Sequence, residues 1–306
     1  MPQCFKSLDL PQFKMKKSIQ FIINPKSGGK SKSKVPIIIE RYLDKNQFDC
    51  EISFTNSEKE TLTLAESSVK NNIDIIVAVG GDGTINNIAK YVKNSNTVLG
   101  IIPFGSGNGF ARELKLYGSI KNSIQIINKQ NIKQVDTGMV NEHFFCNLAG
   151  VGFDAHVGGL FAESTTRGFQ TYIKITLNEY KKYKPKLYKI KASNNEIINV
   201  EAFMICVCNG PQFGNNAYIA PQAKLDDGIF DISIVKPFSI WETPTIAMTL
   251  FSKNDKTHSF LERVKSNEFT ILRVNDDMVN IDGEPIKMGK ELNFRMFAKS
   301  LKVLIP

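Results

Sequence analysis

The chain has 306 residues, of which 42% are hydrophobic and 23% charged, an ordinary globular composition with enough length for two domains. The formal net charge of +9 favours an anionic partner: a nucleotide, a nucleic acid or an anionic membrane surface. We expect no nucleic-acid partner, because the sequence holds no helix-turn-helix, zinc-finger or RNP signature. Five scattered cysteines without a CxxC pair argue against a zinc or disulfide framework. With neither a signal peptide nor a long apolar run in view, we expect a cytoplasmic protein, at most peripheral to a membrane.

The first part of the chain, from residue 18 to about 131, alternates between strand-like and helix-like segments. Strands are expected at 18–23, 50–54, 73–79 and 98–102, and helices at 35–44, 59–71, 85–92, 110–114 and 119–128. This order predicts right-handed βαβ units around a mainly parallel sheet. We therefore expect a Rossmann-like α/β domain over residues 1–132.

After about residue 132 the sequence pattern changes to short segments separated by Gly, Asn and Asp. This pattern predicts an antiparallel β-sandwich over residues 133–296. Its strands are expected at 133–140, 143–148, 188–192, 198–208, 229–235, 268–274, 279–282, 292–296 and 300–304. Helical stretches interrupt them at 167–183 and around 239–251 and 256–264. These helices are expected to cover a sheet. The alternative is an apolar, lysine-edged surface where a lipid enters.

The most informative motif is Gly-Gly-Asp-Gly-Thr at residues 80–84, between an apolar, β-branched run and a helical pattern. The motif therefore lies on a strand-to-helix turn, where ligands bind at the carboxyl ends of parallel strands. Its glycines let a phosphate approach the backbone, and the helix start offers free N–H groups. A carboxylate beside phosphates makes most sense with Mg²⁺ between them, which predicts a metal-assisted phosphate site at Asp82. The alternative is a βα turn whose glycines serve geometry alone.

Two further loops follow strand-like segments. Residues 24–31 resemble a P-loop but lack its first glycine, since position 24 is Asn; the loop is either a phosphate-facing turn or a solvated basic turn. Residues 103–109 contain a Gly-x-Gly, but Phe110 stands where a dinucleotide fingerprint needs a third Gly or Ala. Three glycine-rich loops at three strand ends are hard to explain as turns alone, because glycine costs backbone entropy.

The second part holds two acidic clusters. Residues 224–228, Lys-Leu-Asp-Asp-Gly, are turn-like, and a role in holding a hard cation is the alternative to a plain hairpin. Residues 280–285 place Asp282 and Glu284 on either side of a glycine. If the strand stays extended through Gly283, both side chains point into one cleft. The turn then becomes the best candidate for a base that faces bound phosphates from the other domain.

Together these motifs resemble the soluble lipid kinases, the family of diacylglycerol, sphingosine and ceramide kinases. The resemblance covers residues 23 to about 302 and rests on several motifs in the same order: residues 23–29, 79–86, 103–108, 136–138, 147–154, 225–228 and 282–284. It implies an N-terminal nucleotide domain, a C-terminal β-sandwich, a tail of about 297–306 that packs back on the first domain, and ATP-dependent phosphorylation of a lipid hydroxyl.

The resemblance also implies roles for individual residues. The ATP contacts would be Asn24, Pro25, Lys26, Ser27, Gly28, Thr55, Gly80, Gly81, Asp82, Gly83, Thr84, Ile85, Asn86 and Ser106. A structural Mg²⁺ would be held by Asp227 with the carbonyls of Lys224 and Ile229. Glu284 would accept the proton of the lipid hydroxyl with Asp282 beside it, while Mg²⁺ near Asp82 offsets phosphate charge. Ser106 stands where many diacylglycerol-kinase-like members have Thr, which leaves the lipid open.

Two alternatives remain open from the sequence. An NAD kinase-like enzyme would use a similar Gly-Gly-Asp-Gly-Thr loop. A non-catalytic lipid-binding protein on the same fold would keep the architecture without turnover. The expected partners are a lipid substrate and an anionic membrane surface, and a homodimer is left open.

Overall fold

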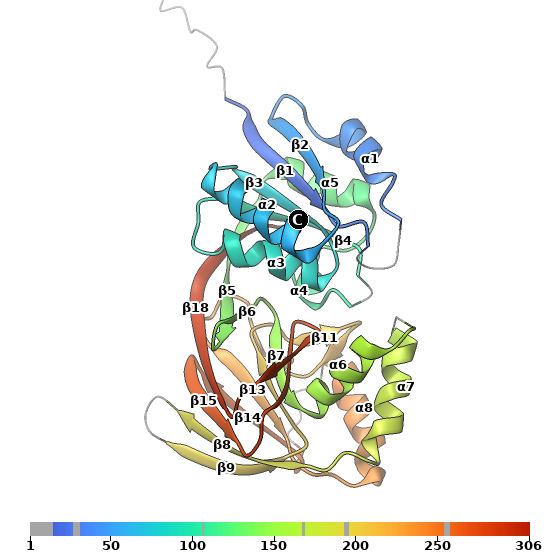
Figure 1. The fold of residues 1–306 in the computed structure, drawn as a ribbon, viewed down its shortest axis with the longest axis vertical. Coiled ribbons are helices and arrows are strands. Elements are labelled where there is room, and N and C mark those ends of the chain that lie inside the picture. The colour runs from blue at the N-terminus through green and yellow to red at the C-terminus, as the bar shows by residue number, and fades with distance from the viewer. Residues whose placement is uncertain (1–14, 27–30, 106, 167–168, 193–195, 254–257) are drawn as a thin grey trace, which may run out of the picture.

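A computed structural model describes residues 15–26, 31–105, 107–166, 169–192, 196–253 and 258–306. Figure 1 shows two lobes stacked along the long axis, an α/β lobe above and a mainly β lobe below. The fold is α/β with a parallel-containing sheet and a separate antiparallel sheet, which confirms the predicted fold class.

The upper lobe is built on four parallel strands in the order β2-β1-β3-β4. Their bounds are β1 (Lys17–Ile23), β2 (Phe48–Phe54), β3 (Ile75–Gly80) and β4 (Val98–Pro103). Every residue of β3 is buried, as its β-branched sequence predicts for a central parallel strand. The strand order reverses between β1 and β3, which opens a crevice at their carboxyl ends.

Helices cover both faces of this sheet. One core cluster joins the sheet to α1 (Val35–Tyr42) and α5 (Ile120–Lys129). The opposite cluster joins it to α2 (Glu58–Lys70), α3 (Asp82–Val92) and α4 (Gly109–Glu113). Helix α3 begins at Asp82, three residues before the sequence pattern predicts, so the second half of the glycine-rich motif forms its first turn.

The lower lobe packs two sheets face to face. A six-stranded antiparallel sheet has the order β14-β13-β10-β7-β16-β17. Its strands are β7 (Leu148–Gly152), β10 (Met204–Cys208), β13 (Phe230–Val235), β14 (Leu261–Ser266), β16 (Asp277–Ile281) and β17 (Glu284–Met288). The facing strands are β5 (Ile132–Val140), β6 (His143–Phe145), β8 (Lys186–Ala192), β9 (Ile197–Ala202), β15 (Glu268–Arg273) and β18 (Glu291–Leu304). One cluster of buried side chains from both sheets fills the space between them, with Phe145 stacked on Phe230.

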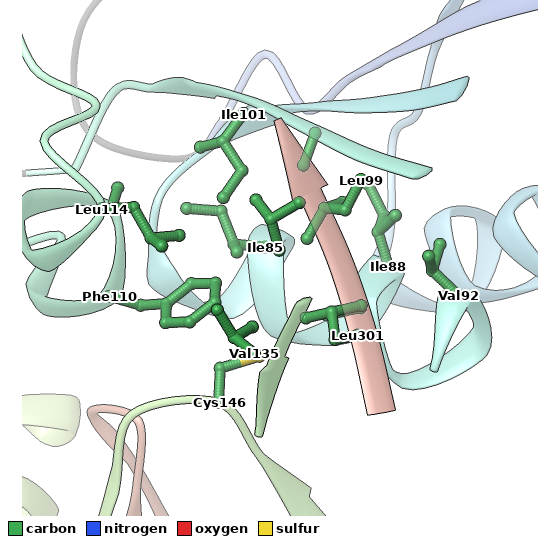
Figure 2. Packing of buried hydrophobic residues seen from close by; sticks show 14 of the residues in the cluster. Ile85, Ile88, Val92, Leu99, Ile101, Phe110, Leu114, Val135, Cys146 and Leu301 are labelled. Carbon is green, nitrogen blue, oxygen red and sulfur yellow. The ribbon is translucent and has the colours of Figure 1, made fainter. Parts of the chain in front are cut away.

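The long strand β18 runs through both lobes. It pairs antiparallel with β15 and β5, and near its end it pairs parallel with β4, with Val303 opposite Leu99. The sequence pattern predicts two strands here, and a register shift between Phe297 and Leu301 explains the apparent break. Figure 2 shows Leu301 among Ile85, Ile88 and Leu99 in the core of the upper lobe. The C-terminal segment thus completes the upper sheet.

Helices cover the outer face of the six-stranded sheet. They are α6 (Phe153–Glu163), α7 (Phe169–Tyr180), the 3₁₀ turn η2 (Ile240–Glu242) and α8 (Thr243–Phe251). Residues from α6, α7 and α8 share one apolar cluster with this sheet. Short strands β11 (Gln212–Gly214) and β12 (Ala217–Tyr218) form a separate hairpin. No described helix is long and apolar enough to cross a bilayer.

Three sequence-based predictions about the lower lobe are wrong. Helix α6 was not expected, because its two glycines and mixed pattern hide the helical period. The stretch 256–264 is not a helix: residues 256–257 lie outside the described part, and Leu261 begins strand β14, which pairs along the whole of β13. The single strand expected at 198–208 breaks at Phe203 into β9 and β10, which belong to different sheets.

Candidate active site

The described residues that directly follow β1, and the glycine-rich loops after β3 and β4, meet at the crevice between the lobes. Gly81 and Gly105 pack against each other, and a Cβ added to Gly105 would lie 3.1 Å from the Gly81 Cα. The backbone N–H of Asn24 donates to the Val79 carbonyl at 3.2 Å, and its side chain reaches Thr84 Oγ1 at 3.4 Å. The tertiary structure therefore joins three separate sequence motifs into one glycine-lined cradle at the start of α3.

Asp82 is the first residue of α3 and lies at the floor of this cradle. Its Oδ2 accepts a hydrogen bond from the backbone N–H of Asn108 at 2.9 Å. Burial raises the pKa of Asp82 to about 7, with the bond from Asn108 opposing the shift and the Asp282 carboxylate adding to it. The N-cap residue of α3 is Gly81, which supplies no side-chain cap. The helix start therefore offers N–H groups to an anion, with the Asp82 carboxylate beside them.

Asp282 comes from the other lobe, in the turn between β16 and β17, and its carboxylate is held by four donors. Oδ2 accepts from the Asn86 side chain at 2.8 Å and from the backbone N–H of Cys146 at 2.7 Å. Oδ1 accepts from the backbone N–H groups of Asn147 and Leu148, both at 2.9 Å. Burial raises the pKa of Asp282 and these hydrogen bonds lower it, so the net shift is upward. Both oxygens are occupied, and the side chain clamps the two lobes together.

Glu284 lies two residues further on, at the start of β17, and faces the first turn of α3. A Cβ added to Gly83 would overlap Glu284 Oε1, so the carboxylate lies directly against the Gly83 backbone. The residue is exposed at the rim of the crevice, and its carboxylate accepts no hydrogen bond from the described residues. The pKa of Glu284 is raised, chiefly because loss of water around the carboxylate disfavours its charged form. The negative charges of Glu58 and Asp282 raise it further. Such a carboxylate is available as a proton acceptor.

The expectation that Asp282 and Glu284 point the same way along an extended strand is wrong. Asp282 and Gly283 both have positive φ, at 48° and 93°, and Ile281 pairs with Glu284 across the turn. The chain therefore reverses in a two-residue hairpin loop, as an Asp-Gly pair favours. The reversal sends Asp282 into the backbone N–H groups at the start of β7 and leaves Glu284 facing α3.

The other predicted site residues take several positions. Pro25 and Lys26 follow β1 at the rim, where the Lys26 ammonium reaches the Asn56 carbonyl at 3.4 Å. Thr55 is fully buried, and its hydroxyl bonds that of Thr61 at 2.8 Å, so it supports the loop from below. Ile85 belongs to the hydrophobic core rather than the crevice surface. Ser27, Gly28 and Ser106 lie outside the described residues.

Asn86 and Lys32 contribute in ways that the sequence did not reveal. Besides Asp282, the Asn86 amide donates to the Phe144 carbonyl at 3.1 Å, which ties α3 to β6. Lys32 is 2% exposed, and its ammonium lies 4.8 Å from the centre of the Phe104 ring. Burial lowers the pKa of Lys32. This lysine places a positive charge between Pro25, after β1, and Phe104, after β4, and no sequence pattern singled it out.

The acidic turn at residues 224–228 lies beside β5 and β14, and its Leu225 packs in the core cluster that α3 also joins. Asp227 Oδ2 lies 4.0 Å from the Lys265 ammonium, which also pairs with the buried Asp231 at 3.2 Å. Asp136 holds the turn by accepting from the Gly228 N–H at 2.6 Å. Among the described residues no three acidic, His or Cys side chains cluster closely enough to hold a metal. A metal role for Asp227 with the Lys224 and Ile229 carbonyls stays a prediction, in which a cation competes with Lys265.

Two family models match successive parts of the chain. The diacylglycerol kinase catalytic domain matches residues 18–140, and a YegS C-terminal NAD kinase beta sandwich-like domain matches residues 147–305. A diacylglycerol kinase from Staphylococcus saprophyticus is 30% identical over 95% of this chain and 96% of its own length. The chain belongs to the diacylglycerol kinase family. This confirms the resemblance drawn from the motifs.

Other members of the family agree with this assignment. A diacylglycerol kinase from Staphylococcus haemolyticus is 29% identical over 95% of this chain and 89% of its own length. A crystal structure from Bacillus anthracis str. Sterne, described as a diacylglycerol kinase, superposes with a TM-score of 0.73 at 21% identity, covering 96% of this chain and 98% of the other. A second crystal structure from that organism gives a TM-score of 0.77 at 23% identity over the same shares. The two lobes together thus form the same fold as these two solved structures.

Proposed function

We propose that this diacylglycerol kinase family member transfers the γ-phosphate of ATP to the hydroxyl of a membrane lipid of the diacylglycerol or sphingoid type. The proposal rests on the position of the Glu284 carboxylate. Glu284 belongs to the lower lobe, and its carboxylate lies against the first turn of α3 in the upper lobe. A proton acceptor is thereby placed beside a helix start suited to phosphate. The relatives' name, diacylglycerol kinase, makes diacylglycerol the first lipid to test.

The crevice residues fit a nucleotide with Mg²⁺. Gly81, Gly105 and Gly107 leave the approach to α3 free of side chains, and a Cβ on Gly107 would lie 3.4 Å from Asp82 Oδ2. Asp82 would hold the Mg²⁺, and Asn24, Lys26 and the α3 N-terminus would hold the phosphates. When bound, the Mg²⁺–ATP complex supplies the phosphoryl group and neutralises its charge.

The protein's own residues then perform three tasks. Glu284 takes the proton from the lipid hydroxyl as the hydroxyl oxygen bonds to the γ-phosphorus and ADP leaves. Asp282 and Asn86 fix the position of the Glu284 turn relative to α3, since their hydrogen bond joins the two lobes. Lys32 adds positive charge beside the loops that hold the phosphates. Positioning and charge neutralisation are the main requirements of phosphoryl transfer. We place this reaction at the cytoplasmic surface of a membrane.

The test is a transfer assay with γ-labelled ATP and Mg²⁺. Mixed micelles with diacylglycerol, ceramide or sphingosine are compared with soluble NAD as acceptors. We expect label in a lipid and none in NAD; label in NAD alone would favour the NAD kinase-like alternative. ATP binding without transfer to any acceptor would favour the non-catalytic alternative.

Glu284→Gln should lower kcat by about 10²–10⁴-fold, the usual contribution of a general base, with ATP affinity nearly unchanged. Glu201→Gln, at an exposed position of β9, serves as the matched control and should keep full turnover. If Glu284→Gln keeps its rate while Asp282→Asn loses its rate without loss of stability, Asp282 is the base. If both variants stay active, the turn is structural and the proton leaves by another route.

A further inference from the structure

We propose that one face of the lower lobe, formed by α7, η2 and α8, docks on an anionic lipid bilayer. We call it the α7–α8 face, and its exposed apolar residues are Ile173, Leu177, Ile240, Trp241, Met248 and Phe251. The inference rests on the proposed function, because it names the surface from which a lipid substrate would enter. Figure 1 shows α7 and α8 together at one side of the lower lobe, with α6 between them and the upper lobe.

The exposure on this face is large and concentrated. Trp241 is 87% exposed, Met248 73% and Leu177 63%. Single exposed apolar residues are normal on a protein surface, but a group of them on adjoining helices marks an interaction site. Tryptophan is the side chain most characteristic of the membrane–water interface. The composition of the face therefore fits the interfacial zone of a bilayer.

Helix α8 shows the same property along its length. Its sequence, Thr243–Phe251, contains no charged residue. Ile246 and Leu250 pack inward on the apolar cluster of the sheet, while Met248 and Phe251 point outward and are exposed. A surface helix of a globular protein normally carries polar residues on its outer side. An apolar outer side is stable when it lies against another apolar phase.

The charges around the face favour an anionic surface. Lys174 lies on α7, and Lys181 and Lys184 follow it; all three are exposed, and none forms an ion pair with a described residue. Of the acids on this face, Glu179 pairs with Lys182 and His156, while Glu242 caps η2 through the Ser239 N–H and keeps its charge. Free basic groups beside an apolar patch on a chain of net charge +9 are attracted to anionic headgroups.

The face connects to the proposed catalytic turn through hydrogen-bonded side chains. The Tyr172 hydroxyl, on α7, donates to Asp154 Oδ1 on α6 at 3.2 Å. Asn280, on β16, donates to Asp154 Oδ2 at 2.8 Å, two residues before Asp282. Gly158 of α6 lies against the Asn280 side chain, so the helix runs close over the hairpin. The α7–α8 face is thus linked through α6 to the strand that leads into the Glu284 turn.

Trp241 provides a direct test, because it is the only tryptophan of the chain. The wild-type protein is mixed with phosphatidylglycerol/phosphatidylcholine vesicles that contain no diacylglycerol. We expect a blue shift of the tryptophan emission, quenching by brominated acyl chains, and co-sedimentation that weakens as salt rises. An unchanged emission with vesicle-bound protein would mean that another face docks, and would overturn the proposal. This measurement needs no variant and so does not depend on how a variant folds.

Variants then map the face. Leu177→Asp and Met248→Asp should each weaken vesicle partitioning by about tenfold or more, the loss expected from keeping one large apolar side chain out of the bilayer. Ile37→Asp is the matched control, since Ile37 is also an apolar helix residue, 69% exposed, but lies on α1 of the upper lobe. Equal effects at Ile37 and Leu177 would contradict the proposal. So would a wild-type dimer that Leu177→Asp converts to monomer without loss of vesicle binding.

A water-soluble short-chain diacylglycerol separates this proposal from the proposed function. The face variants should keep the wild-type rate on the dispersed short-chain lipid and lose it on long-chain diacylglycerol in vesicles. If wild type phosphorylates neither lipid, the proposed function fails while the vesicle measurements still decide the docking face. If the variants lose both activities equally, the face acts on catalysis rather than on docking, and the proposal is wrong.

Discussion

At the scale of single residues, three carboxylates share the crevice but differ in their surroundings. The Asp282 carboxylate accepts hydrogen bonds from one side-chain donor and three backbone N–H groups. Asp82, at the start of α3, accepts hydrogen bonds from backbone N–H groups alone, among them that of Asn108. Glu284 accepts no hydrogen bond from the described residues and lies at the rim. The same chemical group is therefore suited to three tasks: a clamp between lobes, a cation ligand and a proton acceptor.

Asp82 should make the stability of the ligand-free protein depend on pH. Its pKa is raised from 3.8 to about 7 in the folded state, mainly by burial, so the folded protein holds the proton that the unfolded chain releases. Stability is then greatest below about pH 4 for this group and falls as the pH rises to about 7. Asp82→Asn cannot ionise, and its amide oxygen can still accept from Asn108. We expect the Tm of this variant, relative to wild type, to rise between pH 5 and 8.

The measurement is a thermal melt at several pH values without nucleotide or metal, together with the transfer assay. The Asp82→Asn protein should gain relative stability at high pH and lose most turnover, because the variant removes the proposed cation ligand. Parallel Tm–pH curves for the two proteins would show that Asp82 ionises normally in the fold. Asp74→Asn, at the opposite end of β3, is a control for removing an aspartate from the same lobe.

At the scale of elements, the key feature is that α3 begins inside the glycine-rich motif. Because the helix starts at Asp82, Gly83 lies in its first turn, and its missing side chain makes room for Glu284. The hairpin of β16 and β17 supplies Glu284 from the other lobe, and the reversal at Asp282 and Gly283 sets its direction. A helix start and a hairpin turn, far apart in sequence, thus define the site together.

Gly83→Ala tests this juxtaposition. The new methyl would overlap the end of the Glu284 side chain, which is flexible and can move away. Alanine also favours a helix more than glycine does, by about 1 kcal/mol, so stability should be unchanged or higher. We expect kcat to fall by at least tenfold, because the proton acceptor is displaced. Gly289→Ala is the control, since a Cβ there meets nothing within 4 Å.

Urea denaturation and the transfer assay together read out this prediction. Loss of activity with full stability is the expected pattern for Gly83→Ala, and the Gly289→Ala protein should match wild type in both. Full activity of Gly83→Ala would mean that Glu284 does not need its position against α3. A large loss of stability would instead show that the turn cannot adjust.

At the scale of the whole molecule, β18 unites the lobes. Its first half lies in the sandwich beside β15, and its second half completes the parallel sheet beside β4. Leu301 and Val303 are fully buried in the upper lobe although they belong to the C-terminal end of the chain. The upper lobe is therefore incomplete without the last residues, and the position of the crevice depends on a strand that both lobes share.

Leu301→Ala should lower the free energy of unfolding by about 2–5 kcal/mol, the usual cost of truncating a fully buried leucine. Figure 2 shows its side chain among core residues of the upper lobe, where it is fully buried. Ile132→Ala is the control, because Ile132 is 47% exposed at the start of β5, and it should cost far less. Urea titrations give both values. Equal losses in the two variants would mean that the end of β18 adds little to the core.

The sequence by itself determined the fold class, the family and the position of the glycine-rich strand-to-helix turn after β3. These follow from local patterns, because the residues of each segment predict its own secondary structure. Examples are the fully apolar strand, the Gly-Gly-Asp-Gly-Thr turn and the helices with periodic apolar residues. The break at Phe203, the strand β14 and the helix α6 were missed or misassigned, because which sheet or face a short segment joins depends on its partners. Local pattern does not contain that information.

Only the tertiary structure decided how the acidic turn works. From the residue pattern, Asp282 and Glu284 were two carboxylates on an extended strand, and only the family resemblance favoured Glu284 as the proton acceptor. In the fold, the hairpin reverses between them, and the N–H groups of residues 146–148 capture Asp282 while Glu284 faces Gly83. The same holds for β18, whose second half contacts a strand about 200 positions earlier, Val303 opposite Leu99. Contacts between segments far apart in sequence determine where Asp282, Glu284 and the end of β18 lie. The chemistry of the site depends on these contacts, because hydrogen-bond donors and burial set the pKa of each carboxylate.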